Sequence, residues 1–240
     1  MISTARQDDI SPETRLAVLR GTYSRLAAPA LVRAMIDNEF VGRITLVSSF
    51  GAESAVLLHM VSAVAVDTPV IFLDTGKLFG ETRRYRDRLV QQLGLTDVRA
   101  ITPDGEALRA GDRNGLLWTR DTDACCDIRK VQPLSRALAG FDAWISGRKR
   151  FQSALRAALP VIEFADGRFK INPLAGWSAD DLRAWMEKYD LPPHPLVADG
   201  YLSIGCMPCT RRVRAGEDPR AGRWAGRDKS ECGIHVAEGI

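Results

Sequence analysis

Short apolar runs that alternate with helical segments constrain the fold of this 240-residue chain more than any other feature. The runs typical of strands are residues 43–48, 69–73, 97–101 and 143–146. The segments with helical periodicity are residues 12–39 (interrupted at Pro29), 55–64, 78–93 and 128–139. This alternation predicts an α/β fold with a mainly parallel sheet flanked by helices.

A hairpin and one more helix are expected in the second half of the chain. Residues 161–164 and 169–172 are strand-like and are separated by Asp166-Gly167, a pair typical of tight hairpin turns. Residues 178–189 form a predicted helix with Ser178 as N-cap. Prolines indicate a loop in residues 190–201, and little periodicity follows. Because no repeat or clean linker interrupts the pattern, we expect one domain with a C-terminal extension.

Polar or glycine-containing loops follow three of the predicted strands, at residues 48–54, 74–76 and 146–150. Ligands of parallel α/β sheets bind at such strand ends. The loop at 48–54 has neither the G-x-x-x-x-G-K-[ST] pattern nor any lysine, but its backbone N–H groups and serines could bind an anion. Taken alone, this loop is better explained as a plain turn between a strand and a helix. Residues 146–156 are basic, and form either a solvated turn or an anion clamp.

Four of the five cysteines occur as two pairs, Cys125-Cys126 and Cys206-x-x-Cys209. An odd number of cysteines without an export signal argues against a disulfide framework. Two thiol pairs indicate a tetrathiolate metal site more than five separate buried cysteines. Adjacent cysteines reach one zinc ion only with backbone strain, so the spacing favours a four-iron cluster, with Lys130 about one helical turn away.

Cys232 is the fifth cysteine, and it lies close to the end of the chain beside Gly233 and His235. Positive charge lowers the pKa of a thiol, and only the thiolate is a nucleophile. Cys232 is therefore either a catalytic nucleophile on a mobile tail or a surface thiol without a role.

The net charge of +3 is concentrated in one segment of the chain. Residues 210–230 contain seven basic and three acidic side chains, so the remaining residues sum to −1. A local excess of this size suits a small anionic ligand better than nucleic acid. The longest nearly apolar stretch has 13 residues, too few to span a membrane. The polar N-terminus is unlike a secretory signal, so we expect a cytoplasmic protein.

Taken together, these motifs make the chain similar to the assimilatory adenylyl-sulfate (APS) reductases, which are sulfonucleotide reductases of the PP-loop group related to ATP pyrophosphatases. The matching segments occur in the expected order: SSFGAES (48–54), FLDTG (72–76), CCDIRK (125–130), SGRKRFQS (146–153), GCMPCT (205–210), RAGRW (220–224) and ECGIH (231–235). The Cys-Cys pair, the C-x-x-C pair and the terminal ECG-x-H are highly specific in combination.

The resemblance implies an adenine nucleotide alpha hydrolase-like fold and three regions within one structural domain. These are an N-terminal helical segment (1–40), an α/β nucleotide-binding domain (41–205) and a mobile C-terminal segment (206–240). It implies reduction of adenylyl sulfate to sulfite and AMP, in sulfate assimilation and cysteine biosynthesis. The reductant would be a separate thioredoxin or glutaredoxin, because no thioredoxin-like domain follows residue 240. A homo-oligomer is left open.

The resemblance also implies a role for individual residues. Cys232 would be the nucleophile, and a [4Fe-4S] cluster would be held by Cys125, Cys126, Cys206 and Cys209. The implied substrate-binding residues are Ser48, Ser49, Gly51, Leu73, Thr75, Lys130, Gly147, Arg148, Arg156, Arg220, Arg223 and His235. Among them, the loop residues would hold the phosphosulfate, and Leu73, Thr75 and Gly147 would lie near the adenosine.

The sequence departs from the ATP pyrophosphatases at the first loop, which has Ser-Phe-Gly-Ala-Glu-Ser in place of Ser-Gly-Gly-x-Asp-Ser. That difference counts against an ATP-dependent tRNA-modifying or adenylating enzyme. Reductases of 3′-phosphoadenylyl sulfate (PAPS) generally lack the four cysteines, so adenylyl sulfate is favoured, with a PAPS or dual reductase as the alternative. A zinc-binding structural protein and a non-catalytic iron–sulfur regulator that binds nucleic acid remain as rival interpretations.

Overall fold

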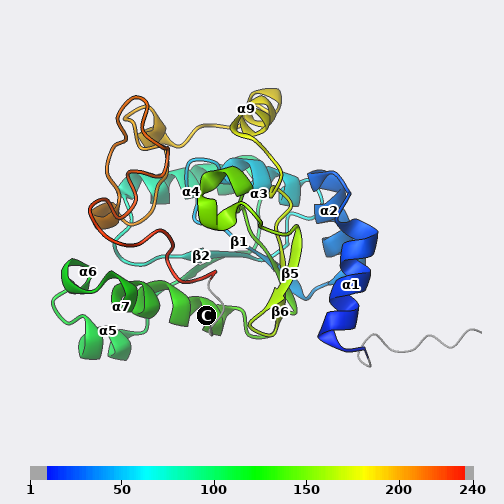
Figure 1. The fold of residues 1–240 in the computed structure, drawn as a ribbon, viewed down its shortest axis with the longest axis horizontal. Helices are drawn as coiled ribbons and strands as arrows, with labels where there is room; N and C mark the ends of the chain where they lie inside the picture. The colour runs from blue at the N-terminus through cyan, green and yellow to red at the C-terminus, as the bar shows by residue number, and fades with distance from the viewer. Residues whose placement is uncertain (1–9, 236–240) are drawn as a thin grey trace, which may run out of the picture.

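The structure, a computed structural model, describes residues 10–235 and is built on one six-stranded sheet with helices on both faces (Figure 1). The predicted N-terminal and C-terminal segments therefore each include a few residues, 1–9 and 236–240, that lie outside the described part. Between residues 10 and 235, no helix has the length and apolar character needed to cross a membrane.

The sheet confirms the predicted α/β fold. Its strands are β1 (Ile44–Val47), β2 (Val70–Leu73), β3 (Val98–Ile101), β4 (Ala143–Ile145), β5 (Ile162–Ala165) and β6 (Arg168–Ile171). They are ordered β3-β2-β1-β4-β6-β5, and every neighbouring pair is parallel except β5 and β6. The chain moves outward from β1 in one direction and returns to β4 on the other side. The strand order therefore reverses between β1 and β4, where sheets of this kind form a ligand-binding crevice.

β5 and β6 form the predicted hairpin. Asp166 (φ 53°) and Gly167 (φ 70°) both have left-handed backbone, as a two-residue type I′ turn requires.

Helices and helical turns cover both faces of the sheet. The α-helices are α1 (Pro12–Tyr23), α2 (Ala28–Ala34), α3 (Ser54–Ser62), α4 (Gly80–Leu93), α5 (Gly105–Gly111), α6 (Leu117–Arg120), α7 (Thr122–Cys126), α8 (Gln132–Ala137) and α9 (Ala179–Lys188). The π-helical turns are η2 (Met35–Glu39) and η3 (Asp127–Val131), and the 3₁₀ turns are η4 (Arg150–Gln152), η5 (Ala154–Arg156), η6 (Pro195–Val197) and η7 (Met207–Cys209).

Alternate residues of the strands belong to two separate apolar cores. Val70 and Phe72 point into the larger core, which includes buried side chains of α2, α3 and α4. Ile71 and Trp144 point the other way and pack with Leu134 of α8. The two-residue periodicity of a strand explains this division. Both faces are covered, as a parallel sheet requires.

The sequence missed the short helices α5, α6 and α7. Neither α5 nor α6 has a buried side chain, so no apolar periodicity marks them. Only N-capping residues could have indicated α5 and α7. Asp104 accepts from two backbone N–H groups at the start of α5, and Asp121 accepts from Ala124 N at the start of α7. The helix expected over residues 128–139 is wrong in its start, because α7, η3 and α8 form one continuous helical path from Thr122.

Candidate active site

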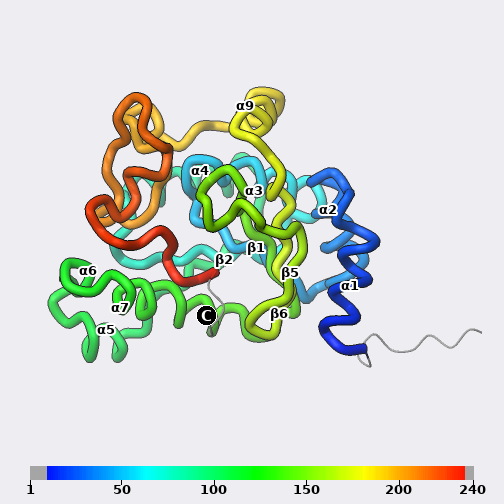
Figure 2. The backbone as a smooth tube through the Cα atoms, in the orientation of Figure 1, coloured from blue at the N-terminus to red at the C-terminus, as the bar shows by residue number. Residues whose placement is uncertain are grey.

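A cavity of about 260 Å³ lies at the point where the strand order reverses. It is lined by the loops that follow β1, β2 and β4 and by the C-terminal segment, which returns to this edge of the sheet (Figure 2). Each residue predicted for catalysis or substrate binding lines it: Ser48, Ser49, Gly51, Leu73, Thr75, Lys130, Gly147, Arg148, Arg156, Arg220, Arg223, Cys232 and His235. The structure therefore brings these residues together, while their individual roles remain predictions.

The loop after β1 is held in shape by its own hydroxyl groups. Phe50 N donates to Ser48 Oγ at 3.2 Å, and Gly51 N donates to Ser54 Oγ at 2.8 Å. Phe50 has left-handed backbone (φ 47°), which costs a bulky residue about 1–2 kcal/mol. Its ring is fully buried and meets Phe72 edge-on at 5.4 Å. Burial of the ring thus offsets the strain of the loop.

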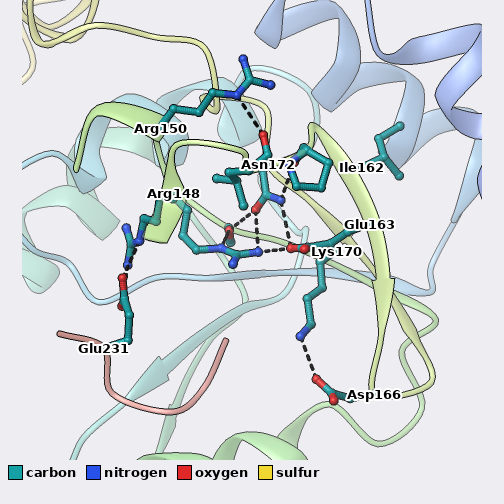
Figure 3. Close-up of polar contacts among 12 residues, drawn as sticks. Arg148, Arg150, Ile162, Glu163, Asp166, Lys170, Asn172 and Glu231 are labelled. Atoms are coloured by element: carbon teal, nitrogen blue, oxygen red, sulfur yellow. Dashed lines mark hydrogen bonds and ion pairs between the residues drawn. The ribbon is translucent and has the colours of Figure 1, made fainter. Parts of the chain in front are cut away.

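Two of the basic side chains that line the cavity are neutralised by partners on other elements. Lys149 Nζ lies 2.6 Å from Glu53 Oε2. Arg148 pairs with Glu163 and also donates to Asn172 Oδ1 at 3.3 Å (Figure 3). Burial lowers the pKa of both basic groups, partly opposed by their carboxylates. Arg148 therefore braces the loop after β4 against the β5–β6 hairpin.

Lys130 and Arg223 form no ion pair with a carboxylate among residues 10–235. Burial acts to lower the pKa of Lys130, but the thiolate forms of Cys206, Cys232 and Cys126 raise it overall. The guanidinium of Arg223 lies over the Trp224 ring at 4.4 Å, and its buried Nε has no hydrogen-bond partner in the described chain. These two cations are available to an anion in the cavity.

Residues near the C-terminus pack into the cavity in this structure. His235 stacks on Trp144 with ring centroids 5.3 Å apart and planes 12° apart. Burial, together with nearby cations such as Arg148, holds the pKa of His235 well below its ordinary value. Its buried Nδ1 finds no partner in the part of the chain that the structure describes. His235 is therefore a neutral hydrogen-bonding group beside the cations.

The four paired cysteines line a second, smaller cavity next to the first. Cys206 and Lys130 line both cavities, and Thr75 Oγ1 lies 3.2 Å from Cys206 Sγ. Burial raises the pKa of Cys126 to about 11 and raises the pKa values of Cys125 and Cys209 as well. No three Cys, His, Asp or Glu side chains converge on a single ion position in the described residues. The four thiols are thus gathered around one cavity.

The acidic partners of the basic side chains escaped the sequence reasoning. Glu163 is paired with Arg148 and Glu231 with Arg156, across 15 and 75 residues of chain. No local periodicity links such positions. Only the presence of Glu231 in the ECGIH segment marked it for attention.

Comparison with known proteins finds a matching family model and several similar proteins. A model of the phosphoadenosine phosphosulfate reductase domain matches residues 43–212. The adenosine 5′-phosphosulfate reductase of Mesorhizobium japonicum is 52% identical over 223 residues, covering 93% of this chain and 88% of that protein. The protein of the same description from Chelativorans sp. is 50% identical, covering 97% and 95%. A phosphoadenylyl-sulfate reductase from Candida auris, solved as a phosphate complex, superimposes with a TM-score of 0.70 at 28% identity, covering 85% of this chain and 98% of that one.

Proposed function

The chain belongs to the phosphoadenosine phosphosulfate reductase domain family, and we propose that it reduces adenylyl sulfate to sulfite and AMP with thioredoxin as reductant. The observation that carries this proposal is the position of Cys232 in a cavity lined by six Lys and Arg side chains. A nucleophile among cations suits a substrate that is anionic at both its phosphate and its sulfate. The relatives at 50% identity or more, named for this substrate, support the same choice.

The first step is attack of the Cys232 thiolate on the sulfate sulfur. A bond forms between the two sulfur atoms, the bond from sulfur to the bridging oxygen breaks, and AMP leaves with that oxygen on its phosphate. Cationic side chains such as Lys130 and Arg223 stabilise the negative charge that grows on the leaving group. The product is an S-sulfonate on Cys232.

The second step supplies the two electrons of the reduction. A thioredoxin thiolate attacks Cys232 Sγ, which releases sulfite and leaves a mixed disulfide. The second thioredoxin thiol then attacks the thioredoxin sulfur of that disulfide, so Cys232 returns as a thiol and thioredoxin is oxidised. A glutaredoxin could supply the same dithiol chemistry. The five free thiols of the chain suit a reducing, cytoplasmic compartment, which forms part of the proposal.

The paired cysteines fit a [4Fe-4S] cluster better than a zinc ion. Zinc would need four sulfurs about 2.3 Å from one point, whereas a cluster separates its thiolates over several irons. The thiols of Cys125, Cys126, Cys206 and Cys209 would hold it. When bound, the cluster would supply negative charge and a rigid support beside Lys130. That side chain would then present its ammonium group to the substrate in the first cavity.

The proposal is tested with anaerobically purified protein, thioredoxin, and either adenylyl sulfate or its 3′-phosphorylated form. Brown protein that releases sulfite from adenylyl sulfate supports it, and the ratio of the two activities separates an APS reductase from a PAPS or dual enzyme. Colourless, zinc-containing protein without sulfite release would refute it.

Replacement of the nucleophile tests the first step. Cys232→Ser should abolish sulfite release, by at least about three orders of magnitude for a removed nucleophile, while iron content and visible absorbance stay unchanged. A serine variant that still releases substantial sulfite would defeat the mechanism.

A further inference from the structure

Glu231, one residue before Cys232, is held by two arginines. Arg156 donates from Nε to Glu231 Oε1 at 2.6 Å and from Nη2 to Oε2 at 2.7 Å, which makes a bidentate pair. Arg220 Nη2 lies 3.6 Å from the same carboxylate and donates to Ser230 O at 2.8 Å. One guanidinium therefore binds both carboxylate oxygens of Glu231, and the other lies beside that carboxylate and binds the backbone that precedes it.

This cluster of charges is sheltered from solvent. The side chains of Glu231, Arg156 and Arg220 are only 15%, 11% and 16% exposed. Charge pairs of this geometry and burial are stronger than exposed surface pairs. In residues 10–235, Glu231 is the single carboxylate that pairs with either arginine. Glu231 is thus the carboxylate that neutralises Arg156 and Arg220. In contrast, Arg148 and Lys149 are neutralised by carboxylates outside the C-terminal segment.

Cys232 lies between this ionic contact and an apolar one. On its other side, Ile234 packs against the core that contains Ile71 and Trp144, and His235 stacks on Trp144. Gly233 has left-handed backbone (φ 89°), which turns the chain between the two contacts. The apolar contact is insensitive to ionic strength, whereas the contact of Glu231 depends on charge.

We propose that Glu231 is the positioning residue that docks the C-terminal segment and so holds Cys232 in the cavity. This rests on the proposed function. In the docked state Arg156 and Arg220, which also line the cavity, pair with Glu231, whereas Lys130 and Arg223 pair with no carboxylate in the described chain. Release of the ion pair frees the segment and exposes Cys232 to a protein reductant.

The test measures how fast iodoacetamide alkylates Cys232 in nucleotide-free protein that carries its native metal content. Peptide mapping separates Cys232 from the other four cysteines. Rates are compared at the alkaline plateau, where the thiol is fully ionised, so that a change in thiol ionisation does not mimic a change in access. Glu231→Gln removes the charge but keeps the shape of the side chain, and we expect on the order of tenfold faster alkylation.

The salt dependence of the alkylation rate distinguishes docking by an ion pair from a merely structural role of Glu231. Added NaCl should accelerate alkylation of the wild-type protein and leave the Glu231→Gln rate unchanged, because no ion pair remains to be screened. Glu231→Asp keeps the charge and should restore the salt response with an intermediate rate. Glu217→Gln is the matched control, since Glu217 pairs with Arg211 on the same C-terminal segment away from the cavity.

Equal plateau rates in wild type and Glu231→Gln, or the same salt response in both, would overturn the inference. No nucleotide and no thioredoxin enter this experiment, so its outcome is independent of the reductase assay. A protein that shows the docking pattern but releases no sulfite would keep the role of Glu231 and refute the proposed reaction. A protein that releases sulfite but shows no docking pattern would keep the proposed reaction and refute the role of Glu231.

Discussion

Arg223 is placed by the absence of a side chain on its neighbour, Gly205. A Cβ built on Gly205 would lie 2.4 Å from Arg223 Nη2 and 2.6 Å from its Cζ, closer than such atoms approach. The ring of Trp224 lies on the guanidinium as well. Arg223 is therefore held against the backbone of Gly205 in the cavity wall, and its Nε has no hydrogen-bond partner among residues 10–235. Gly205 therefore leaves the space that the Arg223 guanidinium occupies beside the cavity.

Gly205→Ala should displace Arg223 without removing any thiol. We expect KM for adenylyl sulfate to rise on the order of tenfold, the loss of one charge-assisted contact, while iron content stays at the wild-type level. Steady-state kinetics and iron analysis measure both. Gly21→Ala is the control, because nothing lies within 4 Å of a Cβ at that exposed position. Loss of iron together with affinity would show that Gly205 serves the cysteines instead.

At the scale of elements, His194 attaches the proline-containing loop of residues 190–201 to α4. Its Nε2 lies 3.1 Å from Thr82 Oγ1, and its Nδ1 accepts from Leu196 N. Tyr85 of α4 donates to Pro192 O at 2.7 Å beside it. His194 is 1% exposed, and burial lowers its pKa to about 4, with Glu81 opposing the shift. The loop is thus attached to the helix through a neutral imidazole.

This attachment predicts a pH dependence of global stability. Between pH 6.5 and about 4 the unfolded chain binds a proton at His194 that the folded protein excludes. The free energy of unfolding should therefore fall as pH falls through this window, by about 1.4 kcal/mol per pH unit from this group.

Urea unfolding of wild type and His194→Gln at several pH values isolates that contribution. The difference between the two proteins should shrink as pH is lowered. A difference that stays constant from neutral pH to pH 4 would show that His194 is not buried neutral.

Helices and strands with clear periodicity could be predicted from the sequence, because each repeats its burial pattern within the element. The candidate site could be located in part, since three of the predicted loops follow strands whose ends the topology brings to one edge. Phe50 shows what lies beyond such reasoning. Its left-handed backbone is stabilised by a ring packed against Phe72, a contact between residues that are 22 positions apart in the sequence. Ion pairs such as Glu231–Arg156 are equally non-local.

At the scale of the whole molecule, the two cysteine pairs lie where the helical path of α7 meets the C-terminal segment. Cys125 and Cys126 belong to α7, whereas Cys206 and Cys209 flank η7, and all four line one cavity. Between residues 206 and 228 the regular structure is a single 3₁₀ turn. That segment therefore depends on side-chain contacts for its order, and on the cluster if the proposed function holds.

Removal of the metal should loosen this segment before it affects the sheet. Iron-free protein should lose hydrogen-exchange protection in residues 206–228 by at least about tenfold, while β1 and β4 keep theirs. Mass spectrometry of proteolytic peptides measures the difference. Uniform loss across the sheet would mean that the metal stabilises the entire fold, and no loss at all would mean that the cysteines do not hold this segment.

The docked C-terminal residues also have a kinetic consequence. Cys232 lines the same cavity as the loop after β1 and the residues that follow β2 and β4. A nucleotide in that cavity and a protein thiol approaching from solvent cannot reach one sulfur atom at the same time. On the proposed function, the two substrates would then bind in succession, with AMP released before the reductant reacts. Initial-rate plots against adenylyl sulfate at several thioredoxin concentrations should be parallel lines, the signature of a ping-pong enzyme that stores its half-reaction on a covalent intermediate.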